Sequence, residues 1–147
     1  MRIVILILML GGTLSTAAEP TTNTLLPIMR IYTGEDGRTH FAEGAMVLEV
    51  ENFSAQTPPF AVSQRLSATD IAFATMPPGW FGDWHPAPRR QYVLMLQGQF
   101  EIETGDGEIR RFNAGETFLV EDTSGPGHRT RVISEEPVVL AMVPTGF

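Results

Sequence analysis

The sequence predicts an all-β fold of the sandwich, barrel or jelly-roll type, in a single domain. Short apolar segments recur along the chain and are separated by turns rich in Gly and Pro, which is typical of sandwiches and barrels. No window of ten or more residues has sustained helical spacing. A jelly roll accommodates about ten such strands by folding two sheets together, which also protects their edges.

The strands of the N-terminal half are expected to begin with a hairpin. The alternating segment PIMRIYT is followed by the turn Gly34–Gly37, and the chain then returns as a second strand. A polar, proline-bearing loop interrupts the strands that follow, and Pro77-Pro78-Gly79 breaks the chain sharply. The strands expected in this half cover residues 27–33, 38–41, 45–50, 62–66 and 71–76.

The C-terminal half has clearer strand signals. The segment 92–96 is apolar on both faces, as in a strand covered on both sides. Residues 99–104 alternate between apolar and acidic side chains, and Asp106-Gly107 is a tight-turn signal. The strands expected here cover 92–96, 99–104, 108–112, 117–120, 128–133 and 137–143.

The first residues have the organisation of a secretory signal peptide, which we expect to span residues 1–18. Arg2 precedes an apolar run, Ile3–Leu10, and small residues precede the expected cleavage after Ala18. The run is shorter than the stretch of about 20 apolar residues that a transmembrane helix needs. A buried N-terminal strand is the alternative interpretation of these first residues. The mature domain, residues 19–147, is expected to be periplasmic or secreted, with no membrane partner after cleavage.

Composition excludes several functions. The formal net charge of −7 makes nucleic acid or an anionic membrane a poor partner. The chain has no Cys, so disulfides, a thiol nucleophile and a Cys-ligated metal are all excluded. It also has no Lys, which excludes Schiff-base chemistry on a side-chain amine.

Polar side chains with strand parity mark a candidate site. His85 and Gln91 share parity with Val93, so all three are expected to face the interior, subject to the prolines between them. His128 and Thr130 share one face of a later strand. Two imidazoles and an amide oxygen form a reasonable site for a borderline divalent ion.

The spacing of these residues resembles the first motif of the cupin family, which is Gly, five residues, His-x-His, three residues, Glu, six residues, Gly. Gly79, His85, Gln91 and Gly98 occupy the matching positions. Ala87 replaces the second His, and Gln91 replaces the Glu.

The second cupin motif is matched in part. Gly115 fits its start, but Glu121-Asp122-Thr123 replaces Pro-x-Gly, and His128 arrives two residues late. Val132 replaces its closing Asn. The segment W-H-x-x-P-R-R-Q is also similar to a subgroup of small cupins.

The resemblance implies a double-stranded β-helix with a pocket inside the barrel. Cupins commonly hold Fe, Mn, Zn or Ni on three His and one carboxylate, and here the implied metal ligands are His85, Gln91 and His128, with His40 as the candidate fourth. Other candidates near the second motif are Glu121 and Asp122, and Asp122 could also orient His128 as an outer partner.

The expected substrate pocket adds residues around this site. Arg89 could pair with a carboxylate group of a substrate. Trp80 and Trp84 could stack on a flat ligand, or could simply close the core. Met95 and Thr130 are the remaining residues of the expected substrate pocket. Three functions stay open: a metal-dependent enzyme acting on a small organic molecule, a small-molecule-binding protein without metal, and a structural protein. A homodimer is expected as the candidate assembly.

Overall fold

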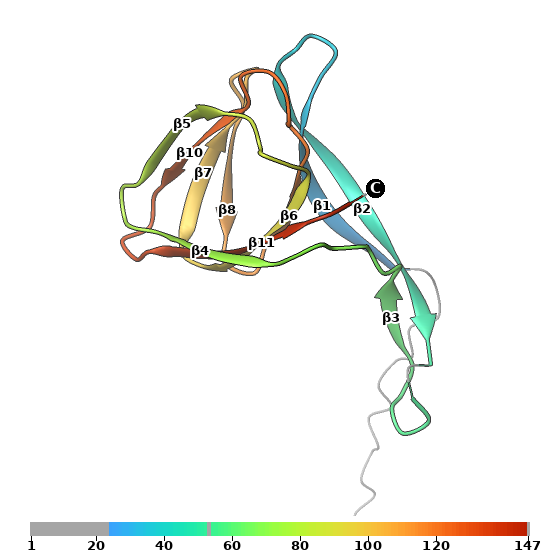
Figure 1. Cartoon of the computed structure of the whole chain (residues 1–147). Coiled ribbons are helices and arrows are strands. Elements are labelled where there is room, and N and C mark those ends of the chain that lie inside the picture. The colour runs from blue at the N-terminus through green and yellow to red at the C-terminus, as the bar shows by residue number, and fades with distance from the viewer. Residues whose placement is uncertain (1–23, 53, 147) are drawn as a thin grey trace, which may run out of the picture.

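The computed structural model describes residues 24–52 and 54–146, and Figure 1 shows their path. The expected signal peptide lies outside these residues. The described residues form strands and no helix, so none of them forms a helix able to cross a membrane. The strands are β1 (Thr24–Thr33), β2 (Thr39–Glu51), β3 (Phe60–Ser63), β4 (Ala72–Met76), β5 (Phe81–His85), β6 (Gln91–Gln97), β7 (Gln99–Glu103), β8 (Ile109–Asn113), β9 (Thr117–Val120), β10 (His128–Val132) and β11 (Val138–Pro144).

Two sheets face each other, which confirms the predicted all-β jelly-roll class. The larger sheet has the order β3-β2-β1-β9-β6-β11-β4, and the smaller has the order β5-β10-β7-β8. Neighbouring strands are antiparallel except for β1 and β9, which are parallel. In Figure 1 the smaller sheet closes one side of the barrel, and β4, β11 and β6 close the other.

Two details differ from the sequence prediction. The segments 38–41 and 45–50, expected as separate strands, belong to the single strand β2, because β1 pairs with it continuously from Thr33↔Thr39 to Thr24↔Leu48. The segment around His85 was expected as an edge or bulged strand, but the bounds of the edge strand β5 were not predicted, since its sequence FGDWH has little alternation. It forms by pairing with β10.

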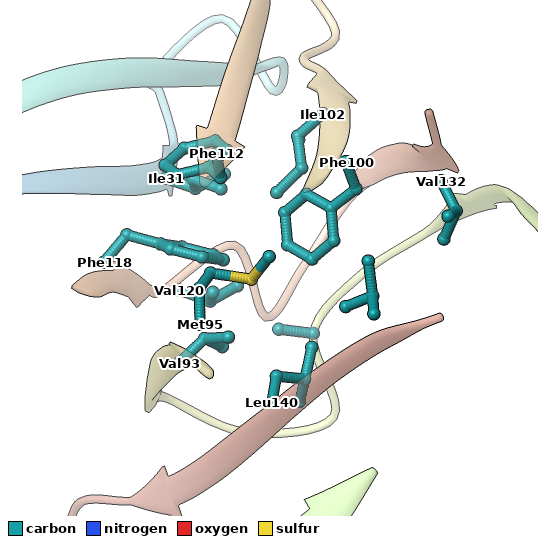
Figure 2. Packing of buried hydrophobic residues seen from close by; sticks show 12 residues of the cluster. Ile31, Val93, Met95, Phe100, Ile102, Phe112, Phe118, Val120, Val132 and Leu140 are labelled. Carbon is teal, nitrogen blue, oxygen red and sulfur yellow. The ribbon is translucent and has the colours of Figure 1, made fainter. Parts of the chain in front are cut away.

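The hydrophobic core lies between the two sheets. Phe118 on β9 packs against Phe112 at a ring-centroid distance of 4.3 Å and against the edge of Phe100 at 6.0 Å. Figure 2 shows these rings with Met95 and Val93 pointing toward the same interior. Side chains alternate in direction along β6 and β7, so their buried residues lie on this side. The expected cover on both faces of residues 92–96 is incomplete, because Leu96 on the other face of β6 is 51% exposed.

The outer ends of β1 and β2, with β3, extend beyond the barrel as an arm (Figure 1). Leu25 and Val47 are cross-strand neighbours in this arm and are 61% and 49% exposed. Val50 and Phe60 are also exposed. The arm therefore presents apolar side chains that the barrel does not cover.

Candidate ligand cavity

A cavity of about 170 Å³ lies inside the barrel, between the two sheets. Its walls are mostly apolar, and its polar side chains are two histidines, a glutamine and a threonine. The residues that line it are Ala74, Met76, Trp80, His85, Ala87, Pro88, Gln91, Val93, Phe100, Ile102, Phe118, Val120, His128, Thr130, Leu140 and Met142.

The strand β6 brings Gln91 to the cavity. Gln91, Val93 and Met95 are buried while the residues between them are less so, as expected for one inward face of a strand. Gln91 and Val93 line the cavity, and Met95 is buried in the core beside it. The predicted inward parity of this strand is therefore confirmed.

His85 and His128 meet across the strand pair β5–β10. They are register partners, and their ring centroids are 4.9 Å apart. His128 is only 8% exposed, whereas His85 is exposed to solvent. Since both line the cavity, His128 is at its inner part and His85 marks where it reaches the surface.

Gly127 allows the two histidines to approach. Its φ is +75°, and a Cβ at this position would overlap the backbone carbonyl of His85. The hydroxyl of Thr39 donates to the carbonyl oxygen of Gly127 at 2.8 Å and fixes the segment from the other side. Sequence reasoning missed this glycine, although its place directly before His128 was a usable signal.

Hydrogen bonds fix the tautomers of both histidines. Nδ1 of His128 donates to Oδ2 of Asp122 at 2.6 Å, and Nδ1 of His85 donates to the carbonyl oxygen of Asp83 at 2.6 Å. A carbonyl or carboxylate oxygen only accepts, so each neutral imidazole carries its proton on Nδ1. Each Nε2 is left with a free lone pair.

Asp122 is wholly enclosed, with 0% exposure. Its backbone carbonyl accepts a hydrogen bond from the N–H of Ala87 at 3.0 Å, so the segments after β5 and before β10 are joined. The expected contact with His128 is confirmed, but Oδ1 has no partner among the described residues. A buried carboxylate oxygen without a partner carries a desolvation cost.

His40 lies elsewhere. Its Nδ1 bonds Asp106 at 2.8 Å and its Nε2 bonds Asp36 at 2.9 Å, and it does not line the cavity. The hydrogen bonds to Asp36 and then Asp106 raise the pKa of His40 above its ordinary value. The structure therefore does not bring the expected fourth metal ligand into the site.

Two of the expected pocket residues line the cavity. Trp80 does so from the segment before β5, and its ring lies over Gly82. Thr130 does so from β10 and is buried. Met95, which was expected with them, belongs to the core cluster.

Arg89 and Trp84 point away from the cavity. Arg89 is exposed and donates to Asp70 at 3.3 Å. The guanidinium of Arg129 lies over the ring of Trp84, 5.1 Å from its centroid. For Arg89, strand parity failed because the segment with two prolines between β5 and β6 is not part of either strand. Trp84 lies on β5 itself, next to His85, so it faces the opposite side of the strand.

Glu121, like Arg89 and Trp84, does not line the cavity. Its two oxygens accept hydrogen bonds from Arg30 and Arg90, both at 2.7 Å. Burial raises the pKa of the Glu121 carboxyl, but the bonds from Arg90 and Arg30 outweigh it, so its pKa lies below the ordinary value. The three side chains tie β1, the segment before β6 and the segment after β9 together.

The donor set does not fit a tightly held metal. Two imidazoles and the neutral amide of Gln91 include no carboxylate or thiolate, and only the two imidazoles are of the ligand types usual in zinc sites. Within residues 24–52 and 54–146, no three His, Asp or Glu side chains group in a way that could hold a metal ion. The position of the second motif histidine is occupied by Ala87, which is buried in the wall.

The fold and the cavity define a β-barrel protein with an internal, largely apolar pocket. Residues 72–144, about half of the chain, match the family model described as "Cupin domain". The chain therefore belongs to the cupin superfamily. No curated protein matches it.

Solved structures similar to this chain include cupin domains. A cupin domain from Bordetella pertussis Tohama I is 15% identical, with a TM-score of 0.44, over 69% of this chain and 94% of that one. A "Cupin 2 conserved barrel domain protein" from Salinispora arenicola CNS-205 is 15% identical, with a TM-score of 0.44, over 67% of this chain and 73% of that one.

Proposed function

We propose that this chain is an exported protein that binds a small organic molecule inside the barrel. The observation that carries the proposal is the cavity, whose walls are apolar and whose few polar groups converge around His85, Gln91 and His128. Small-molecule sites in proteins have this composition, and the mouths of β-barrels are a common place for them. The assigned histidine tautomers supply two acceptor atoms for orienting a ligand.

Cavity filling tests this proposal. The probe is toluene, monitored by NMR of ¹³C-methyl-labelled methionines, because Met76 and Met142 line the cavity and Met46 does not. Ala74→Leu should fill part of the cavity and abolish the toluene shifts of Met76 and Met142. Ala72→Leu, on the same strand but outside the cavity, is the matched control and should leave them unchanged. Equal shifts in wild type and Ala74→Leu, or none in wild type, would contradict the proposal.

The second candidate is a metal-dependent enzyme that uses His85, Gln91 and His128. The observation in its favour is that both Nε2 atoms are free to bind Fe, Mn, Zn or Ni. Bound metal should be measured in protein purified without a metal-affinity tag, together with His85→Ala and His128→Ala. Stoichiometric metal that both substitutions remove would favour this candidate. Sub-stoichiometric metal that added ions do not restore would exclude it.

We also propose that the exposed arm pairs with a second copy of the chain. Leu25 and Val47 form an exposed apolar cross-strand pair on it, and patches of this kind mark association surfaces. Light scattering of the mature protein should give a dimer mass, and Leu25→Ser with Val47→Ser should give a monomer. Leu96→Ser, an equally exposed position on the barrel, should stay dimeric. A monomeric wild type would overturn this.

Export is part of the proposal and is supported by the sequence of residues 1–18. Intact mass of the protein recovered from its native compartment should correspond to a chain beginning at Glu19. A mass that includes Met1 or Arg2 would contradict cleavage after Ala18.

A further inference from the structure

We infer that the cavity selects an uncharged, single-ring-sized molecule that carries a hydroxyl group, and that Asp122 sets this selectivity through His128. The inference rests on the proposed ligand-binding function and specifies its ligand class. It joins three observations: the size of the cavity, the absence of a charged side chain in its wall, and the donor or acceptor role of each polar group that lines it.

The size of the cavity limits the ligand. Its volume is about 170 Å³. An apolar cavity of about 150 Å³ in another protein binds benzene. A single aromatic ring with a small substituent is therefore the class of molecule that the space holds.

The side chains of the cavity wall disfavour a charged ligand. Apart from the two histidines, none of the lining side chains is ionisable. The arginines next to lining residues in the sequence are engaged elsewhere: Arg89 pairs with Asp70, Arg90 with Glu121 and Thr145, and Arg129 with Glu103. The guanidinium of Arg131 lies over the ring of Phe81. With both imidazoles neutral, a buried carboxylate ligand would lack a cationic partner and carry a large desolvation cost.

The polar groups of the cavity favour a ligand that can donate a hydrogen bond. Nδ1 of His128 and of His85 both donate, so in the neutral imidazoles the two Nε2 atoms are acceptors. The side chains of Gln91 and Thr130 make no hydrogen bond to other described residues and remain available to a ligand oxygen. A hydroxyl can donate to Nε2 of His128 and accept from the amide or hydroxyl beside it.

Asp122 is the positioning residue. It does not line the cavity, yet it is fully buried with Oδ2 on Nδ1 of His128 and Oδ1 without a partner among the described residues. Its structural hydrogen bond to Ala87 uses only the backbone carbonyl, which any residue has. The carboxylate itself therefore acts on His128, whose proton it holds on Nδ1.

The test compares phenol with toluene, which have similar size and differ in the hydroxyl. Affinities come from the Met76 and Met142 methyl shifts, and the proton position on His128 comes from ¹⁵N shifts of the labelled imidazole. In the wild type, phenol should bind about fivefold more tightly than toluene, as expected for one net hydrogen bond. The ¹⁵N shifts should show His128 protonated on Nδ1.

In Asp122→Asn, the Nδ1–H form should lose population and the preference for phenol should fall toward one, while toluene still binds. Asp70→Asn removes a carboxylate at the surface and should change neither quantity. Equal binding of phenol and toluene by the wild type, or His128 protonated on Nε2, would overturn the inference while leaving ligand binding intact. Binding of neither probe would instead contradict the proposed function.

Discussion

The backbone of Gly127 lies against the carbonyl group of His85, closer than any residue with a Cβ would permit. This contact lets β10 begin beside the end of β5, so that His128 faces His85. The geometry of the histidine pair therefore depends on a residue with no side chain.

Gly127→Ala should separate the two strand ends and weaken probe binding in the cavity. The positive φ adds a cost of roughly 1 kcal/mol, and the overlap with His85 adds more. Gly107→Ala is the matched control, because Gly107 also has a positive φ but no neighbour that a Cβ would meet. Thermal unfolding and toluene binding should show a larger loss for Gly127→Ala. Equal losses in the two variants would exclude the steric explanation.

Glu121→Gln should destabilise the fold by about 1–3 kcal/mol, since it weakens charge-assisted hydrogen bonds with Arg30 and Arg90. Glu108→Gln, which affects an exposed pair with Arg110, should cost less than about 1 kcal/mol. Chemical denaturation at neutral pH measures both.

The same carboxyl should contribute to acid sensitivity. Because its pKa in the folded protein lies below the ordinary 4.5, its stabilisation is present above pH 4.5 and is lost as the pH falls through the folded-state value. The free energy of unfolding should therefore drop less steeply in acid for Glu121→Gln than for the wild type. Parallel pH curves would contradict this.

His40 should give a pH dependence of the opposite sign. Its pKa in the folded protein is raised above 6.5 by Asp36 and Asp106. Its stabilisation is therefore complete below pH 6.5 and is lost as the pH rises through the folded-state value. The melting temperature of the wild type should fall over this range, and His40→Asn should flatten the fall. A variant with the same slope as the wild type would show that another group titrates.

Phe118→Ala should cost about 3–5 kcal/mol, because Phe118 packs against Phe112 and Phe100 in the core and its truncation leaves a void. Phe73→Ala is the control: its side chain is 69% exposed on β4, and the expected change is within about 0.5 kcal/mol. Denaturant unfolding distinguishes the two, and similar losses would mean that Phe73 is covered in solution.

The sequence predicted the elements in which local pattern and packing agree. On β7, alternation of apolar and acidic residues predicted the inward face correctly, and on β6 the parity of Gln91 with Val93 did so. The motif spacing placed His85 and His128 near each other, which the structure confirms.

Other features depended on contacts that no local pattern encodes. His40 faces two carboxylates from different turns, and Arg89 leaves the inward face because prolines interrupt the strand. The length of β2 follows from its pairing with β1, and the importance of Gly127 follows from the passage of β5 alongside it.

Ala87 has a consequence for how this protein can change over evolutionary time. Its side chain forms part of the cavity wall at the position where the family motif has a histidine, and its backbone is already anchored to Asp122. Replacing this one methyl group with an imidazole would add a third nitrogen donor beside His85 and His128. The proposed ligand-binding barrel thus differs by one wall residue from a barrel that would present three histidine donors to its cavity.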